Sequence, residues 1–352
     1  MTQSSPLDSS TLEAILTRIP YLTIGIVGDL FLDRYLDLDA ALTEPSLETG
    51  LDAYQVANVR SIPGAAGTVI NNLAALGVGR VCPLAVLGDD GEGYELRQAL
   101  NRMAAVDSQR LLFTPERRTP TYTKPMLCAQ GQPPRELNRL DIKNRTPMPP
   151  ALEAQIVRAL SEMWPQVDAL VVLDQVSEKD CGVVTTRVRE ALAELTAQEP
   201  GKFVLADSRE RIGLFQGVYL KPNRHEALSA AGICEADGES ALERAAVYLA
   251  RRAGRSVFCT EGAHGILLAS PQDEETALRP RIPAYPVYGP LDIVGAGDST
   301  SAAIVCAMAA DSGVETAAAF GNLVASITIQ QLGTTGTASP AQIRQRRREV
   351  SG

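Results

Sequence analysis

Histidine and paired cysteines are scarce in this sequence, and their scarcity excludes several kinds of catalytic chemistry. The 352 residues include only two histidines, His225 and His264, too few for a histidine-rich metal site or an ordinary Ser-His-Asp triad. The six cysteines are scattered without any C-x-x-C pair, so we expect buried free thiols. Any catalysis must therefore depend on carboxylates, backbone amides and lysine.

Long apolar runs and a surplus of positive charge are missing as well. The longest apolar stretches, such as 169–173, fall far below the roughly 20 residues that a membrane-spanning helix needs. No basic segment followed by an apolar one opens the chain, so we see no secretory signal and expect a cytoplasmic protein. The net charge of −9 argues against nucleic-acid binding, and we interpret the basic run Arg344–Arg348 as a solvated helix end.

An alternation of strand and helix patterns dominates the second half of the sequence. Hydrophobic residues make up 45% of the chain and charged residues 21%, which is ordinary for a globular protein with a sizeable core. After Thr146 the predicted helices are 151–163, 182–198 and 242–253, and the predicted strands are 169–174, 203–207 and 256–260. This alternation predicts an α/β fold with a central, mainly parallel sheet and helices on both faces.

Two β-rich segments, 35–62 and 110–145, interrupt the alternation. We interpret them as one small β-sheet lid beside a core made of residues 1–34, 63–109 and 146–352. Exposed strand edges on such a lid invite pairing between subunits, so we expect a homodimer through the lid.

The sharpest local pattern is Asp292-Ile-Val-Gly-Ala-Gly-Asp298, directly before a long apolar helix. Because Gly295 and Gly297 lack side chains, backbone N–H groups around Ala296 can converge on an anion at the positive end of the helix. Such a pocket fits a transferring phosphoryl group, and Asp298 beside it can accept the proton of an attacking hydroxyl. A glycine-rich turn in which Asp298 only caps the helix is the alternative.

The chain resembles the ribokinase-like (PfkB) sugar kinase family over about residues 20 to 340, because it has three of the family's motifs in the family's order. The segment 292–298 is similar to the family's D-T-x-G-A-G-D signature, with Ile293 where threonine is usual. Lys221–Glu226 resembles its N-x-x-E motif, and Pro63–Gly67 stands at its Gly-Gly substrate motif. Within the family, the chain is most similar to the kinases of D-glycero-D-manno-heptose 7-phosphate. Four short segments resemble motifs of that group: Gly28–Tyr35, Thr121–Lys124, Arg139–Asp141 and Leu332–Thr335.

The resemblance implies ATP as the phosphoryl donor and Mg²⁺ as the cofactor. Asp298 would be the catalytic base, and Gly295, Ala296 and Gly297 would form the anion hole. Asn223 and Glu226 would organise Mg²⁺ and its waters, a site typical of a hard cation with oxygen ligands. For Glu226 alone, an exposed glutamate in the first turn of a helix is the alternative.

The resemblance also implies a nucleotide site and an accessory cation site. Three residues of a T-x-G-x-x-G turn would border the nucleotide, namely Thr260, Gly262 and Gly265. Asn322 would line the adenine pocket, although it could equally be an ordinary polar residue of a helix. Asp292 and the carbonyl groups of Val294 and Gly333 would bind a monovalent cation such as K⁺.

For the acceptor, we expect Asp29 and Asp33 to accept hydrogen bonds from sugar hydroxyl groups. The alternative is one surface aspartate and one that forms a salt bridge. The resemblance also places three substrate-loop residues and two lid residues at the acceptor: Gly64, Ala65, Thr68, Lys124 and Arg139. Lys124 would meet a second phosphate if the acceptor has one, or would otherwise be a solvated lysine.

The acceptor motif departs from that of the heptose kinases at two positions. Ala65 replaces a glycine whose backbone approaches the sugar, and Thr68 replaces an asparagine that binds it; Asn71 or Asn72 could compensate. We therefore expect an ATP-dependent kinase acting on a sugar or sugar-phosphate hydroxyl, such as that of a heptose 7-phosphate. A nucleoside kinase of the same fold and a catalytically silent sensor of sugar phosphates or nucleotides are the alternatives.

Overall fold

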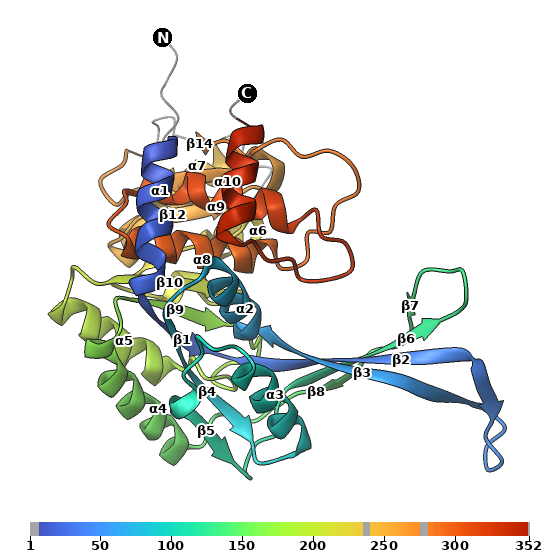
Figure 1. Ribbon diagram of the computed structural model, residues 1–352. Helices are drawn as coiled ribbons and strands as arrows, with labels where there is room; N and C mark the ends of the chain where they lie inside the picture. Colours follow the sequence, from blue (N-terminus) through green and yellow to red (C-terminus); the bar gives the residue numbers. More distant parts are fainter. Residues whose placement is uncertain (1–6, 235–239, 275–280, 351–352) are drawn as a thin grey trace.

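The computed structural model describes residues 7–234, 240–274 and 281–350, and it shows a body of helices around a sheet (Figure 1). The nine strands of this sheet run in the order β14-β13-β12-β11-β10-β9-β1-β4-β5. In chain order they are β1 (Thr23–Gly28), β4 (Arg80–Gly88), β5 (Leu111–Thr114), β9 (Ala169–Asp174), β10 (Phe203–Ser208), β11 (Tyr219–Leu220), β12 (Val257–Thr260), β13 (Ile266–Ala269) and β14 (Arg281–Ile282). Neighbours from β5 to β12 are parallel, and β13 and β14 are antiparallel additions at one edge, so the predicted mainly parallel sheet is confirmed.

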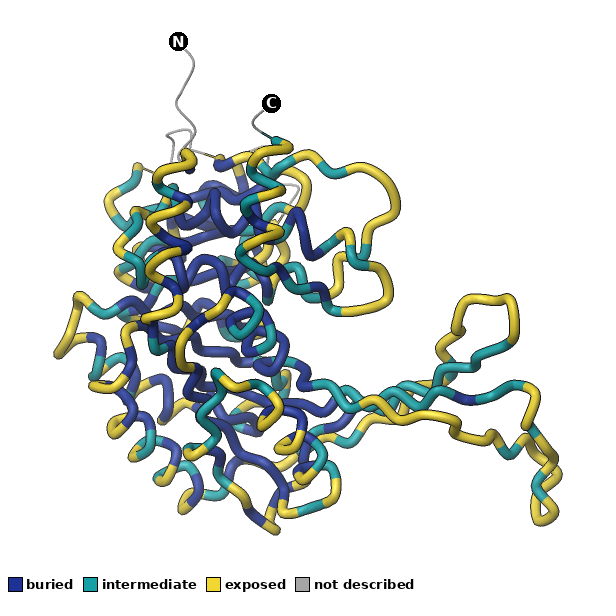
Figure 2. Tube along the Cα trace, viewed as in Figure 1, coloured by how far each residue is buried: buried dark blue, intermediate teal, exposed yellow. Residues whose placement is uncertain are grey.

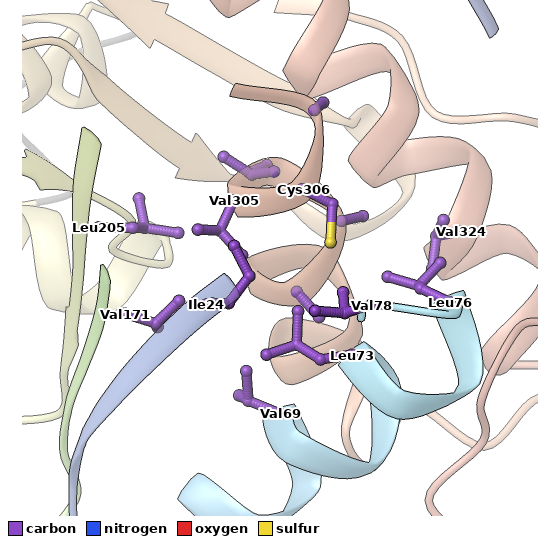
Figure 3. Close-up of a cluster of buried hydrophobic side chains, with 14 of the residues drawn as sticks. Ile24, Val69, Leu73, Leu76, Val78, Val171, Leu205, Val305, Cys306 and Val324 are labelled. Carbon is purple, nitrogen blue, oxygen red and sulfur yellow. The ribbon is translucent and has the colours of Figure 1, made fainter. Parts of the chain in front are cut away.

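Alternate side chains of the central strands enter two separate cores, one on each face of the sheet. Ile24, Val171 and Leu205 point toward the helices of the first core (Figure 3), whereas Leu170 and Val172 enter the second. The first core is covered by α1 (Ser9–Arg18), α2 (Ala66–Leu76), α3 (Gly91–Asn101), α8 (Ala296–Ala309), α9 (Val314–Thr328) and α10 (Pro340–Glu349). The second is covered by α4 (Pro150–Met163), α5 (Thr186–Gln198), α6 (Arg224–Ala231) and α7 (Ala241–Ala253). The expected α/β architecture, with helices on both faces of a central sheet, is thereby confirmed.

The second sheet, for which we keep the name lid, projects from the body as a long arm (Figure 1). Its strands are β2 (Leu30–Pro45), β3 (Asp52–Ala65), β6 (Thr121–Cys128), β7 (Arg135–Glu136) and β8 (Leu140–Ile142). They run in the order β3-β2-β6-β7, and β8 pairs with β6. Much of the outer arm is exposed, whereas its base merges with the buried interior of the body (Figure 2).

The lid boundaries differ from those predicted at both segments. β2 begins at Leu30 and β3 ends at Ala65, so the pairing reaches into the body. β5 (Leu111–Thr114), which we assigned to the lid, pairs in parallel with β4 and belongs to the main sheet. The reason is a crossover through α3, which returns the chain beside β4 and buries Leu111.

Two expectations about the surface also need correction. None of the six cysteines forms a disulfide, but only four are buried, whereas Cys128 is half-buried and Cys234 is exposed. The basic run in α10 is held against the body: Arg344 pairs with Glu13 of α1 at 2.8 Å, and Nε of Arg347 donates to the carbonyl of Leu7. Across the described ranges, every helix is too short or too polar to cross a membrane.

Ala65, at the junction of β3 and α2, has a backbone conformation that disfavours a side chain. Its φ is 53° and its ψ is −118°, a region that is essentially reserved for glycine. The family resemblance has a glycine at this position, so the alanine retains the glycine conformation at a cost in strain.

Replacing Ala65 with Gly is expected to raise the free energy of unfolding by about 1 kcal/mol, because strain relief exceeds the added entropy of the unfolded chain. Urea denaturation measures the change. Ala66→Gly, at the fully buried first position of α2, is the matched control and should lower stability by about 1 kcal/mol. Destabilisation by both substitutions would contradict strain at Ala65.

Candidate active site

The carboxyl ends of the parallel strands bring several charged side chains to one edge of the sheet. Asp29 follows β1, Asp174 ends β9, Asp207 lies near the end of β10, and Lys221 follows β11. Helix α8 begins at the same edge, since Ser301 in its second turn donates to Asp207 at 3.4 Å. Ligands of open α/β sheets bind at this edge.

The predicted anion hole lies at the start of α8. Gly295 caps the helix with a φ of 79°, and a Cβ there would lie 3.4 Å from Cγ2 of Thr68. The N–H of Ala296 donates to the carbonyl of Ile293 at 3.1 Å, so it is engaged within the turn. In the described part of the chain, the N–H groups of Gly295 and Gly297 have no hydrogen-bond acceptor, which leaves them available to an anion.

Asp298 is a half-buried carboxylate in the first turn of α8, beside these N–H groups. Burial raises its pKa to about 7, and the negative charge of Asp207 adds to the rise, whereas Lys221 opposes it. A carboxylate with this pKa exchanges its proton near neutral pH, which is the property of an effective general base.

Lys221 is the main cation of this site, and the sequence analysis did not assign it a role. Its Nζ forms a buried salt bridge with Oδ2 of Asp207 at 2.8 Å. A Cβ at Gly297 would lie 3.6 Å from the same Nζ, so the ammonium group adjoins the start of α8. Lys221 could have been found from its position two residues before Asn223, as the first residue of the segment that resembles the N-x-x-E motif.

Asn223 and Glu226 form a reciprocal capping box at the start of α6. The N–H of Asn223 donates to Oε2 of Glu226 at 2.7 Å, and the N–H of Glu226 donates to Oδ1 of Asn223 at 2.9 Å. Burial raises the pKa of Glu226, and Asp207 adds to the rise. The pair therefore caps α6, and its part in holding Mg²⁺ stays a prediction.

The donor set around Glu226 suits Mg²⁺ carried mainly by phosphate groups and water. Among residues 7–234, 240–274 and 281–350, no three His, Cys, Asp or Glu side chains form a group able to hold a metal ion. Mg²⁺ commonly keeps several waters and binds one or two carboxylates together with substrate phosphates. Glu226 and Asp207 fit that arrangement.

The predicted nucleotide residues border a hollow at the end of β12. It is lined by Asn223, Arg224, His225, Thr260, Glu261, Gly262 and His264. Gly265 lies beside it with a φ of 90°, and a Cβ there would lie 2.1 Å from the carbonyl oxygen of Ile282. Asn322 is mostly buried, and its Nδ2 donates to the carbonyls of Ile282 and Pro283 at 2.9 and 3.1 Å. Its amide nitrogen is thus engaged in holding the chain after β14.

The three residues of the predicted monovalent-cation site lie together. Oδ1 of Asp292 accepts from the N–H of Val294 at 3.1 Å, and Oδ2 accepts from the N–H of Gly333 at 3.0 Å. The carboxylate therefore links the loop before α8 to the loop after α9.

One face of the lid gathers several predicted acceptor residues. Asp33 pairs with Tyr122 and Tyr35 pairs with Lys124 across β2 and β6, so the four side chains project to the same side. Nζ of Lys124 lies 3.1 Å from Oδ1 of Asp33 and donates to the hydroxyl of Tyr35 at 3.2 Å. Lys124 is therefore neither isolated nor fully solvated.

Glycine at position 64 lets Asp33 lie against the lid backbone. A Cβ at Gly64 would lie 2.5 Å from Oδ2 of Asp33. Arg139 pairs with Asp141 at 2.7 Å, and its guanidinium group covers the ring of Tyr122 at 4.4 Å.

A pocket, which we call the basal pocket, lies where this lid face meets the sheet edge. Its wall includes Asp29, Phe31, Arg117, Tyr122, Gln175 and Arg209. Phe31 and Tyr122 pack edge to face with ring centroids 5.3 Å apart, so the pocket continues the face that carries Asp33.

Asp29 differs from the role expected for it. Its Oδ1 accepts from the N–H of Val183 at 2.7 Å, and its Oδ2 accepts from the N–H of Gln175 at 3.1 Å. Burial raises its pKa to about 6. Because each oxygen already holds a backbone donor, Asp29 anchors the loop between β9 and α5 rather than offering a free carboxylate to a sugar.

The two asparagines of α2 that could compensate for Thr68 differ in their surroundings. Asn72 is buried and donates to the carbonyl of Thr68 at 2.9 Å. Asn71 is half-buried, and its amide lies 3.4 Å from the carbonyl of Pro63, next to the substrate loop. Thr68 itself is buried beside Gly295, between the loop and the start of α8.

Comparison with known proteins identifies relatives along most of the chain. The family model described as pfkB family carbohydrate kinase matches residues 32–342. The "Bifunctional protein HldE" of Pelobacter propionicus is 32% identical over 346 residues, which is 96% of this chain and 65% of that protein. The "Bifunctional protein HldE" of Trichlorobacter lovleyi is 30% identical over 339 residues, again 96% of this chain and 65% of the relative. The chain thus spans about 65% of the length of these curated relatives.

Solved structures share the fold at low sequence identity. Ribokinase of Arabidopsis thaliana, complexed with ribose and ATP, matches with a TM-score of 0.65 at 15% identity, over 92% of this chain and 98% of that chain. Phosphofructokinase-2 of Escherichia coli, in complex with potassium, matches with a TM-score of 0.68 at 16% identity, over 94% and 99% of the two chains.

Proposed function

We propose that this chain, which belongs to the pfkB family of carbohydrate kinases, transfers the γ-phosphoryl group of ATP to a hydroxyl group of a sugar or sugar phosphate. The observation that carries the proposal is the pairing of Asp298, whose pKa is about 7, with unengaged N–H groups at the start of α8. Phosphoryl transfer to a hydroxyl group requires a base that accepts the hydroxyl proton and, next to it, a site that binds the phosphoryl anion.

In the proposed reaction, Asp298 accepts the hydroxyl proton of the acceptor as its oxygen attacks the γ-phosphorus. The N–H groups of Gly295 and Gly297, with the positive end of α8, stabilise the charge on the phosphoryl oxygens. Lys221 adds positive charge at the same helix end. Mg²⁺, when bound with ATP, would neutralise phosphate charge near Asn223 and Glu226.

The lid supplies the acceptor side of the proposed site. Asp33 can accept hydrogen bonds from sugar hydroxyls, and Lys124, held at 3.1 Å from it, can meet an anionic substituent. A lid over the acceptor also excludes water, which would otherwise compete for the phosphoryl group. We include K⁺ at Asp292, Val294 and Gly333 as a further part of the proposal.

A heptose 7-phosphate is the first acceptor to test, because the short motifs of the sequence resemble those of heptose 7-phosphate kinases and relatives carry the name HldE. The test is ADP release with a panel of sugars, sugar phosphates and nucleosides at saturating MgATP. Preferred turnover of a sugar or sugar phosphate supports the proposal. Preference for nucleosides would make the chain a nucleoside kinase, and ATP binding without stimulation by any acceptor would favour a silent sensor.

We also propose that two copies associate through the lid. β3 is an edge strand, and the outer arm exposes large apolar side chains at Leu42, Leu47, Leu51, Val56 and Val59. An exposed apolar edge strand favours pairing with another strand. Light scattering at micromolar concentration is expected to give twice the mass of the chain.

Replacing Val56 and Val59 together with lysine should yield the monomer mass, since two charges would have to be buried at the interface. The matched control places lysine at Leu332, an exposed apolar residue of the body, and should keep the dimer mass. A monomer mass for the unaltered protein would exclude the lid dimer.

A further inference from the structure

Arg209 occupies a distinctive place at the sheet edge, immediately after β10. Its backbone N–H donates to the carbonyl of Asp174 at 3.3 Å, which continues the pairing of β10 with β9. Its Nε donates to Oε1 of Gln175 at 2.9 Å, which fixes the near side of the guanidinium group. The residue is otherwise exposed.

The outer nitrogens of Arg209 are unengaged. Within the described part of the chain, its two terminal nitrogens have no hydrogen-bond acceptor, and no carboxylate lies within salt-bridge distance. Arg211, two residues later, is the opposite case: it pairs with Asp174 at 2.6 Å and donates to the carbonyls of Ser177 and Val176. Arg211 therefore serves the fold, whereas Arg209 has no comparable structural use.

Arg209 also adjoins both halves of the proposed site. It forms part of the wall of the basal pocket together with Asp29 and Gln175. Two residues earlier in the same segment, Asp207 accepts from Ser301 of α8 at 3.4 Å and pairs with Lys221 at 2.8 Å, so the end of β10 also contacts α8. Arg209 therefore belongs to a segment that adjoins both the basal pocket and the helix that carries Asp298.

We infer that Arg209 is a catalytic residue that contacts the phosphoryl group as it passes from ATP to an acceptor held in the basal pocket. The inference rests on the proposed function. During transfer, the acceptor oxygen forms a bond to the γ-phosphorus, the bond from that phosphorus to the β–γ bridging oxygen breaks, and the hydroxyl proton moves to Asp298. ADP leaves with the electron pair of the broken bond, and Arg209 keeps its own protons throughout.

The guanidinium group suits this task better than an ammonium group. Charge in the transition state is spread over the three equatorial oxygens of the phosphoryl group. The two free terminal nitrogens of Arg209 can donate to two of these oxygens at once, while Nε stays bonded to Gln175. Lysine at this position would carry its three donors on one rotatable nitrogen without the fixed planar fork, and it would lose the bond to Gln175 that orients the side chain.

The first test measures kcat and KM of Arg209→Ala and Arg209→Lys with the preferred acceptor. We expect Arg209→Ala to lower kcat by about 10²- to 10³-fold, with KM values for ATP and acceptor within about threefold. Arg209→Lys should lose less activity, and millimolar guanidinium ion should restore part of the activity of Arg209→Ala only. The neighbouring exposed residue gives the matched control Glu210→Ala, which should retain full activity.

Other kinetic outcomes would overturn the inference. A rise in acceptor KM with unchanged kcat would make Arg209 a binding residue, and no change at all would give it no part in the reaction. A fall in melting temperature equal to that of Arg211→Ala would assign it to the fold instead.

A second test separates this inference from the proposed function. Calorimetry with Mg²⁺, ADP and aluminium fluoride, which mimics the phosphoryl group in transfer, requires no turnover. Arg209→Ala should weaken binding of this complex by about 10²-fold while leaving MgADP affinity unchanged. If the unaltered protein turns over no acceptor but this loss is seen, the proposed function fails and the role of Arg209 stands. Equal affinity of the variant and the unaltered protein would refute the role of Arg209.

Discussion

Replacing Asp298 with Asn is expected to lower kcat by about 10³-fold while leaving the affinity for MgATP almost unchanged. Asparagine has nearly the same shape, but it cannot accept the hydroxyl proton of the acceptor. The N–H groups at the start of α8 and the hollow near Thr260 are not altered by the change. Steady-state kinetics and nucleotide titration measure the two quantities.

The pH dependence provides an independent check on Asp298. Because its pKa is about 7, the carboxylate is protonated and inactive as a base at lower pH. The value of kcat/KM for the unaltered protein should therefore fall about tenfold per unit below pH 7 and level off above it. The residual activity of Asp298→Asn should lack this dependence.

Two controls distinguish loss of a base from loss of the fold. Burial raises the folded-state pKa of Asp298 above its unfolded value of 3.8, so the charged form opposes folding as pH rises from about 4 to above 7. At pH 8, Asp298→Asn should consequently melt no lower than the unaltered protein. Asp311→Asn, just beyond the other end of α8 at a φ of 61°, makes the same chemical change and should retain full activity. Activity of Asp298→Asn within tenfold of the unaltered protein would contradict a catalytic base at this position.

Replacing Lys221 with Met is expected to lower the free energy of unfolding by about 3–5 kcal/mol, because Asp207 would be left as a buried charge without its partner. The salt bridge of 2.8 Å has side chains that are only 4% and 11% exposed. Asp298 and Glu226 nearby would also lose the cation that favours their charged forms. Urea denaturation at pH 8 measures the change.

The double variant Lys221→Met with Asp207→Asn tests this explanation, since it removes both charges together. We expect it to recover at least half of the lost stability, yet to stay inactive if Lys221 serves the phosphoryl group as proposed. Lys143→Met is the stability control, because Lys143 is 36% exposed and lies 3.8 Å from Asp141, and it should cost less than about 1 kcal/mol. Equal costs at positions 221 and 143 would show that burial of the salt bridge contributes little.

Local sequence patterns explain why the predicted motifs lie together at the sheet edge. Apolar strands that alternate with helices dictate a parallel sheet, and the ends of parallel strands share one edge. The motifs at Asn223, Thr260 and Asp298 each follow or adjoin such an end. Their proximity could therefore be predicted without knowing any long-range contact.

Other features depended on pairings between distant segments. Lys221 meets Asp207 because β10 and β11 are neighbours, and Asp33 meets Lys124 because β2 and β6 pair in register. Neither pairing has a local signature. The same is true of Arg209, which is oriented by Asp174 and Gln175 at the end of β9.

The sequence by itself determined the order of strands and helices, the glycine-rich start of α8 and the carboxylate beside it, because each follows from periodicity or residue type over a few positions. Only the tertiary structure decided that Asp29 holds a loop instead of a sugar, that β5 joins the main sheet, and that Arg209 keeps free nitrogens beside Arg211. These outcomes depend on which backbone donors and side chains arrive from elsewhere in the chain. A carboxylate or guanidinium group has the same chemistry in every sequence, and its use is set by the partners that folding brings to it.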